Sequence, residues 1–121
     1  MDVGSRFPTL ISATGRLVAA FTDIPQSETE RRFRSLRWQQ PPEVEIWKKE
    51  VKAVRKRGYS VDRGNYISGV TLVAVPVFDQ SDRMTHSLVA AGVGDRLDAA
   101  RSQALAEDMQ GEAVKLTKLL V

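Results

Sequence analysis

The chain has 121 residues, enough for one domain with a modest core, and its 42% hydrophobic and 27% charged residues are typical of a globular protein rather than a disordered one. It has no cysteine, which excludes disulfides and thiolate chemistry and favours a cytoplasmic location. The net charge of +3 is uneven, with most of the basic residues before residue 59, but a nucleic-acid-binding domain usually shows a stronger bias along one element. We find neither a signal peptide nor an apolar run long enough to cross a membrane.

Three helices are predicted before residue 58. The first runs from Ser12 to about Phe21 and begins among small residues. The second should begin at Ser27, because Ser27 and Glu30 have the spacing of a capping box. The third, roughly Glu43 to Arg57, carries an apolar stripe and ends at a glycine that suits a helix C-terminus. That stripe consists of Val44, Trp47, Val51 and Val54, and the glycine is Gly58.

Strands and one long helix are expected in the second half. The strands are Tyr59–Val61, Val70–Phe78 and Met84–Gly92, and the final helix covers about Asp98 to Leu120. A hairpin turning at Gln80-Ser81 would pair Asp79 with Asp82, Leu72 with Val89, and Val70 with Ala91. Three strands make a thin sheet to support four helices. We therefore expect the sheet to be completed by strands or a partner outside this chain.

No catalytic residue, metal ligand set or cofactor motif is predicted. His86 has no acid or serine at a motif spacing, and Asp79 and Asp82 are turn residues. Gly92-Val93-Gly94 lacks the third glycine and the βαβ context of a dinucleotide fingerprint. The basic residues of the third helix are interrupted by glutamates, which favours a solvated outer face over phosphate contact.

The segment Ser12-Ala13-Thr14-Gly15 is the most suggestive one for binding. A loop there enters a helix through small residues, so unpaired backbone N–H groups would meet an incoming carboxylate with little side chain in the way. A tight packing position at a helix start would give the same pattern. The residues alone do not separate these two interpretations.

Three segments resemble the IclR (isocitrate lyase regulator) family of transcription factors. The family patterns are Pro-x-x-x-Ser/Thr-x-x-Gly-Lys/Arg, Val-Arg-x-x-Gly-Tyr-x-x-Asp, and Gly-Val followed by Ala-x-Pro-Val-Phe-Asp. They match residues 7–16, residues 54–62, and Gly69-Val70 with Ala74–Asp79, in the same order and followed by a long final helix.

The resemblance implies an α+β, GAF-like effector domain in which helices pack on an antiparallel sheet. Such a domain binds a small-molecule effector and forms a homo-oligomer, either a dimer or a tetramer. Residues 1–121 would be a partial effector domain without its first strands. DNA would be contacted only through a separate N-terminal domain that is not in this chain.

The family's pocket positions can be placed on this sequence by the resemblance. The helix-entry positions fall on Ala13 and Thr14, beside Gly15, and the acid after Gly-Tyr falls on Asp62. The hairpin positions fall on Leu72, Val89 and Ala91, where polar family residues have become aliphatic. The implied effector is therefore an apolar or aromatic carboxylate, bound on an aliphatic floor with polar groups at one end.

The sequence thus predicts a ligand-sensing, oligomer-forming domain of a transcription regulator. One alternative is a pure dimerisation or scaffold fragment whose pocket is filled by its own side chains. A second is a small enzyme on a GAF-like fold, which the lack of a nucleophile or base cluster disfavours.

Overall fold

The computed structural model describes residues 12–22, 27–28, 31, 41–94 and 96–120. Its elements are α1 (Ser12–Phe21), α3 (Val44–Arg57), β1 (Ser60–Arg63), β2 (Val70–Phe78), β3 (Met84–Val93) and α4 (Ala99–Thr117). Each corresponds to a predicted element within a few residues. Of the helix predicted from Ser27, only Ser27, Glu28 and Arg31 are described, all three in helical conformation. The rest of that helix, including its capping residue Glu30, lies outside the described residues.

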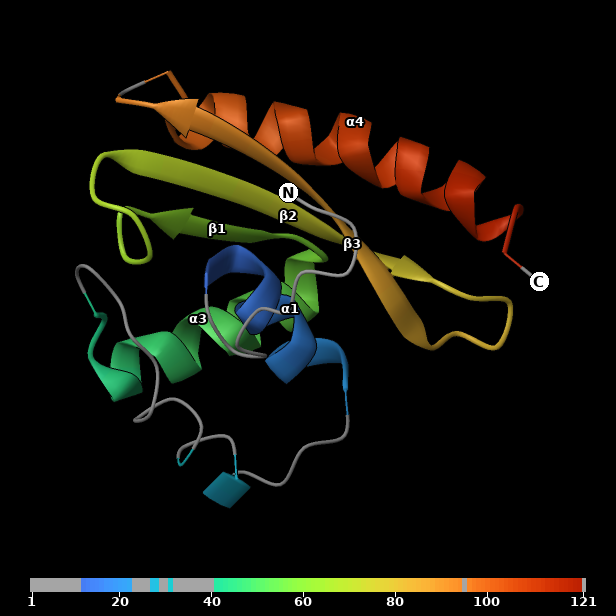
Figure 1. The fold of residues 1–121 in the computed structure, drawn as a ribbon, viewed down its shortest axis with the longest axis horizontal. Helices are drawn as coiled ribbons and strands as arrows, with labels where there is room; N and C mark the ends of the chain where they lie inside the picture. Colours follow the sequence, from blue (N-terminus) through green and yellow to red (C-terminus); the bar gives the residue numbers. More distant parts are fainter. Residues whose placement is uncertain (1–11, 23–26, 29–30, 32–40, 95, 121) are drawn as a thin grey trace.

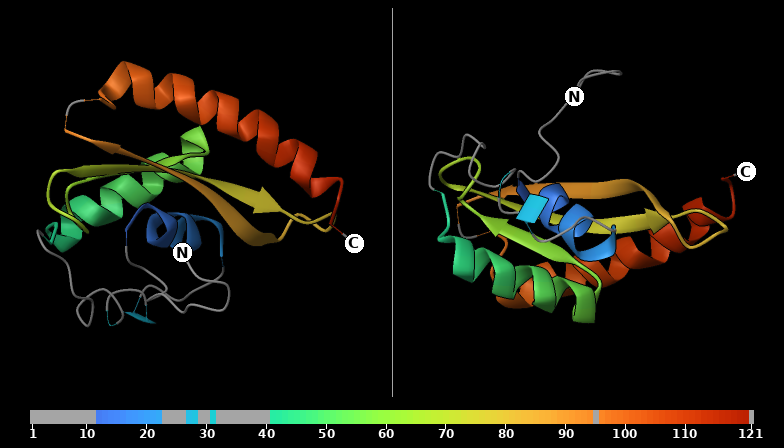
Figure 2. Two further views of the ribbon diagram at one scale, coloured as in Figure 1. Left: turned by 45° about the horizontal axis from the view of Figure 1, so that its top comes forward. Right: turned by 90° about the horizontal axis from the view of Figure 1, so that it is seen from below.

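The described elements form three layers. A three-stranded antiparallel sheet with the order β1-β2-β3 lies in the middle (Figure 1). Helices α1 and α3 cover one face, and α4 covers the other along most of the length of the sheet (Figure 2). This arrangement confirms the α+β class with helices packed on an antiparallel sheet. No helix in the described part of the chain is long and apolar enough to span a membrane.

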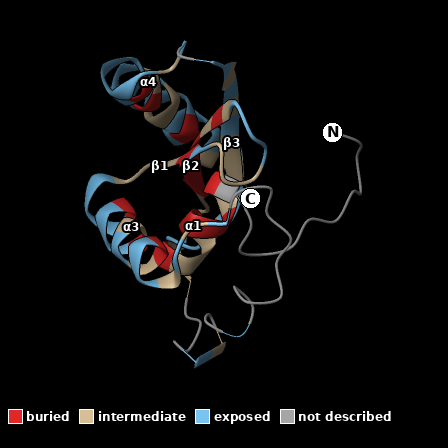
Figure 3. Cartoon of the chain, turned by 90° about the vertical axis from the view of Figure 1, so that its left-hand side faces the viewer, coloured by how far each residue is buried: buried red, intermediate tan, exposed pale blue. Residues whose placement is uncertain are grey.

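Two apolar clusters fill the spaces between these layers, and their residues form the buried interior in Figure 3. The first joins α1 and α3 to one face of β2, and the second joins α4 to the opposite face. The first contains Ala13, Leu17, Ala20, Trp47, Val51, Val54 and Ala74, and the second contains Val73, Val75, Val77, Ala106 and Ala113. Consecutive residues of β2 alternate between the clusters because side chains alternate along a strand.

The hairpin register differs from the predicted one by two residues. Leu72 pairs with Ala91 rather than with Val89, which instead pairs with Ala74. The last pair before the turn is Phe78 with Met84, after an irregularity at Val77/Phe78. The predicted pairing of Asp79 with Asp82 is therefore wrong. A shift of two residues leaves every side chain on the face predicted for it.

The turn itself explains this register. The Asp79 carboxylate accepts the backbone N–H groups of Ser81 and Arg83 at 2.8 and 3.1 Å, and the Asp79 N–H donates to Arg83 O at 2.8 Å. Asp82 adopts the left-handed conformation with φ 62°, which aspartate tolerates better than most residues. The side chain of Asp79 thus stabilises a longer loop than the two-residue turn that was predicted.

A buried arginine connects α1 to the other elements on its face of the sheet. Arg16 is fully buried and donates from Nη1 to Asp62 Oδ2 at 2.9 Å, from Nε to Glu50 Oε2 at 2.5 Å and from Nη2 to Asn65 Oδ1 at 2.9 Å. The other oxygen of Asp62 accepts the backbone N–H groups of Asn65 and Tyr66. Both buried charges are therefore paired, as burial requires.

We predict that Arg16→Met lowers the free energy of unfolding by about 3–5 kcal/mol, because it leaves the buried Asp62 carboxylate without its cation. The double variant Arg16→Met/Asp62→Leu should recover much of that loss. Urea denaturation measures both. The control is Arg31→Met: a hydrogen bond to Glu28 raises the pKa of the Arg31 guanidinium, but the Arg31 side chain is exposed, so no resolvable change is expected. Equal losses for both arginine variants would contradict this role of Arg16.

Candidate ligand site

The predicted site residues lie on one face of the sheet and on the helix above it. Asp62, Leu72 and Ala91 are direct neighbours in a row across β1, β2 and β3. Val89 is in the adjacent row, opposite Ala74, whose side chain packs against α1. Paired residues on neighbouring strands share a face, so all four side chains are on the face that α1 covers.

The first turns of α1 cross this face from β1 to β3. The Ser60 hydroxyl of β1 donates to the Ala13 carbonyl at 2.8 Å, in a buried hydrogen bond. The hydroxyls of Thr14 and Ser87 lie 3.3 Å apart and connect the helix to β3. Gly15 is buried between these contacts and Arg16. The beginning of α1 is thus held over the sheet by polar contacts at both edges.

Asp62 is placed differently from the other predicted residues. Its carboxylate is fully buried, and both oxygens are occupied by Arg16 and by backbone N–H groups of the loop after β1. Because this carboxylate is fully buried, a ligand could reach it only if the residues around it moved. The structure therefore brings Asp62 to the expected face but gives it an internal role.

The β3 residues of the row are open to solvent. Ala91 is exposed and Val89 is 50% exposed, and no described residue of β3 is buried. Leu72, in the middle strand, is half-buried against α1 and α3. The aliphatic floor predicted from Leu72, Val89 and Ala91 therefore exists as a strip that is covered at β2 and open at β3.

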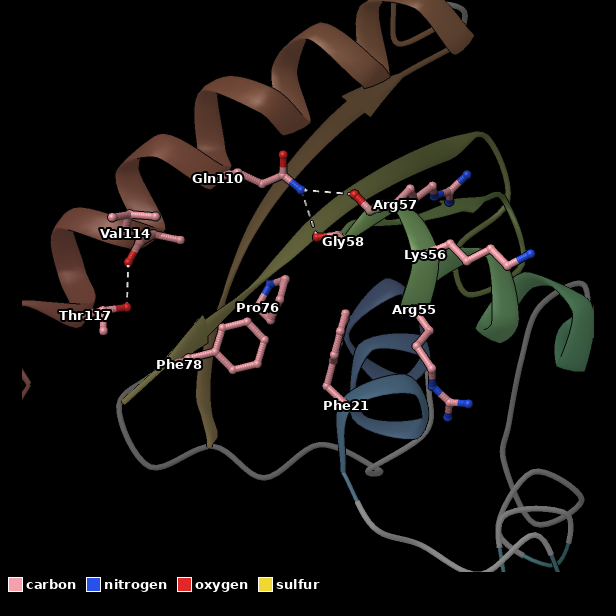
Figure 4. Close-up of a pocket in the computed structure, with 11 residues that line it drawn as sticks. Phe21, Arg55, Lys56, Arg57, Gly58, Pro76, Phe78, Gln110, Val114 and Thr117 are labelled. Carbon is pink, nitrogen blue, oxygen red and sulfur yellow. Dashed lines mark hydrogen bonds between the residues drawn. The ribbon is translucent and has the colours of Figure 1, made fainter. Parts of the chain in front are cut away.

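Two cavities lined by described residues are centred elsewhere. One, of about 330 Å³, lies between the C-terminal ends of α1 and α3, the end of β2 and the last turns of α4 (Figure 4). The other, of about 560 Å³, is a shallow hollow between β3 and α4. Of the predicted site residues, only Val89 borders one of these cavities, and that cavity is the hollow between β3 and α4.

Sequence reasoning missed the polar partners of this face. Ser60, Ser87 and Glu50 were not singled out, because each forms its bond with a residue more than 30 positions away. The signal for Arg16 was present. It is the one charged residue within the ten-residue helix Ser12–Phe21, among small and apolar neighbours, which indicates a charge that must find buried partners.

Metal binding has no structural support in the described residues. Within the described ranges, no three histidine, aspartate or glutamate side chains converge on a common point. His86 lies exposed on β3, where its ring contacts the hydroxyl of Thr85.

Comparison with solved structures identifies this arrangement of helices and strands in bacterial regulators. An IclR transcriptional regulator from Alicyclobacillus acidocaldarius matches with a TM-score of 0.80 and 26% identity, over 98% of this chain and 48% of that one. The repressor BlcR from Agobacterium tumefaciens matches with a TM-score of 0.82 and 20% identity, over 99% of this chain and 50% of that one. This chain thus spans about half the length of these two relatives.

A third similar structure is a ligand complex. The inducer-binding domain of PobR from Acinetobacter, a double mutant in complex with 3-hydroxybenzoic acid, matches with a TM-score of 0.76 and 17% identity, over 98% of this chain and 70% of that one. A search of curated proteins found no match.

The sequence itself matches the family described as "Bacterial transcriptional regulator IclR C-terminal" over residues 1–118, nearly the whole chain. Together with the shared fold, this match confirms the resemblance first seen in three short segments. The chain belongs to the IclR C-terminal family of bacterial transcriptional regulators.

Proposed function

We propose that this chain is the ligand-sensing part of a cytoplasmic transcription regulator and has no catalytic role. The observation that carries the proposal is the placement of the start of α1 over the sheet, where Ala13 meets Ser60 of β1 and Thr14 meets Ser87 of β3. There a helix N-terminus and the hydroxyls of Thr14 and Ser87 are next to an aliphatic strip. A carboxylate at the helix start and an apolar body on the strip would match these surroundings.

The effector we propose is an aromatic or other apolar carboxylate. Asp62 would not repel it, because Arg16 neutralises the Asp62 carboxylate. The aliphatic residues at positions 72, 89 and 91 offer no hydrogen bond to a small keto acid. This chain shares the fold of the PobR inducer-binding domain. The ligand of that domain, 3-hydroxybenzoic acid, belongs to the proposed class of effector.

DNA binding would belong to a separate domain. The apolar stripe of the basic helix α3 is buried against α1, so that helix offers only its outer side to a duplex. The alternative function, a scaffold fragment without a ligand, gains support from the exposure of Ala91 and Val89, which leaves one side of the proposed site open.

We predict that 3-hydroxybenzoate raises the melting temperature by about 5–10 °C at a hundredfold excess over its Kd, because a ligand that binds only the folded state stabilises it. Pyruvate and neutral 3-hydroxybenzyl alcohol should have no effect. Ala91→Phe should reduce the rise without lowering the melting temperature of the free protein, since Ala91 is exposed. The matched control is Ala100→Phe on the exposed side of α4, which should respond like the original chain. If no aromatic acid stabilises the chain, the scaffold interpretation prevails.

We also predict that the chain forms a dimer or larger species at micromolar concentration. In the described sheet, β3 is an edge strand with unpaired backbone groups, and its Val93 is 68% exposed. Val93→Lys should shift sedimentation toward the monomer, because it places a charge on the associating edge. Ile46→Lys, at an exposed position of α3, is the control and should not. A monomer at all concentrations, or equal effects of the two lysines, would argue against association through β3.

A further inference from the structure

The 330 Å³ cavity beside the C-terminal end of β2 has the features of a second ligand site. It is lined by Phe21 of α1, Pro76 and Phe78 of β2, Val114 and Thr117 of α4, and the last residues of α3. None of the residues predicted for the α1 site borders it. Figure 4 shows the rings of Phe21, Pro76 and Phe78 around the same hollow.

The cavity exists because β1 is shorter than β2. Pairing between these strands ends at Ser60 and Ala74, so no strand of the described residues lies beside Val75 to Phe78 on this side. The Gly64 N–H donates to Val70 O, so alternate residues from Val70 onward turn their polar backbone groups toward β1. Pro76 is one of these residues and has no N–H to offer. The open edge is therefore poorly suited to another strand.

The interior of the cavity is apolar and aromatic. The rings of Phe21 and Phe78 meet edge to face, with centroids 5.6 Å apart, and both side chains are only half-buried. Val114 is 60% exposed although it faces the same hollow (Figure 4). Partly exposed aromatic rings around a concave surface are typical of sites for small apolar molecules, and 330 Å³ is at the lower end of the sizes such sites have.

Three consecutive basic residues border the cavity, and its lining within the described part of the chain contains no acid. Arg55, Lys56 and Arg57 border the cavity in sequence, and in the described part of the chain none of them forms an ion pair. The Nε atoms of Arg55 and Arg57 donate to the carbonyls of Ala20 and Tyr59. Lys56 is exposed and has no hydrogen bond within the described residues, and in Figure 4 its amine end points away from the hollow.

The carbonyl end of α3 does not cancel this charge. Such an end normally repels anions because its last carbonyls are unpaired. Here Val54 O accepts the Gly58 N–H at 2.8 Å, and the carbonyls of Arg57 and Gly58 both accept from the Gln110 side chain, at 3.3 and 3.1 Å. The dashed lines in Figure 4 mark these two bonds from α4.

We infer that this cavity binds a small anion with an apolar, one- or two-ring body, such as an aromatic carboxylate, separately from the α1 site. The body lies against Phe21, Pro76 and Phe78, and Val114 closes one side. The carboxylate lies at the mouth, within the positive field of the last turn of α3. No acid among the described residues that line the cavity has to be displaced.

The test is a titration of the ¹⁵N-labelled chain with 2-naphthoate, followed by NMR, which reads the two sites separately. The amides of Gly58, Val114 and Thr117 should shift in a saturable manner. Val114→Trp should abolish those shifts by filling the hollow from an exposed position. Lys56→Glu should weaken binding at least fivefold, whereas Lys52→Glu, an equal charge change at an exposed position of the same helix, should alter it less than twofold.

The neutral analogue 2-naphthamide should bind more weakly than the acid to the original chain and equally well to the Lys56→Glu variant. The inference is overturned if these amides do not shift, if their shifts survive Val114→Trp, or if Lys52→Glu weakens binding as much as Lys56→Glu. Shifts confined to Gly15 and Ala91 would also overturn it, while supporting the α1 site.

Discussion

One buried cation fixes the geometry on which this face of the domain depends. Arg16 cannot be buried without partners, and its partners come from β1, from α3 and from the loop after β1. Because the guanidinium group is planar and rigid, the directions of its three hydrogen bonds fix how α1 lies relative to β1, α3 and the loop after β1. The neighbouring contacts of Ala13 and Thr14 then place the helix start over the sheet.

The same interaction decides which groups can serve a ligand. Asp62 is at a position that the family resemblance assigns to the pocket, yet Arg16 and two backbone N–H groups use its oxygens. The polar character near the start of α1 is left to two hydroxyls, those of Thr14 and Ser87. In the proposed site, the helix start and these hydroxyls would hold the carboxylate, and the aliphatic floor would hold the apolar body.

The sheet is asymmetric, because its two outer strands pair with different lengths of β2. Strand β1 pairs with only four residues of β2, which opens the hollow beside Pro76 and Phe78, while β3 pairs along the whole of β2 and presents its own outer edge. The two proposed sites therefore lie on different parts of the same sheet. Both are bordered by α1, one at its beginning and the other at its end through Phe21.

The sequence by itself determined the elements, their order and the face that each strand residue occupies, because periodicity and glycine or proline signals act over a few neighbouring residues. Most of the second predicted helix lies outside the described residues. Tertiary structure alone decided the hairpin register, since the Asp79 side chain and the left-handed Asp82 select the loop. It also decided that Asp62 faces Arg16 and that Ser87 meets Thr14, because these partners are 46 and 73 positions apart and no local pattern encodes such distances.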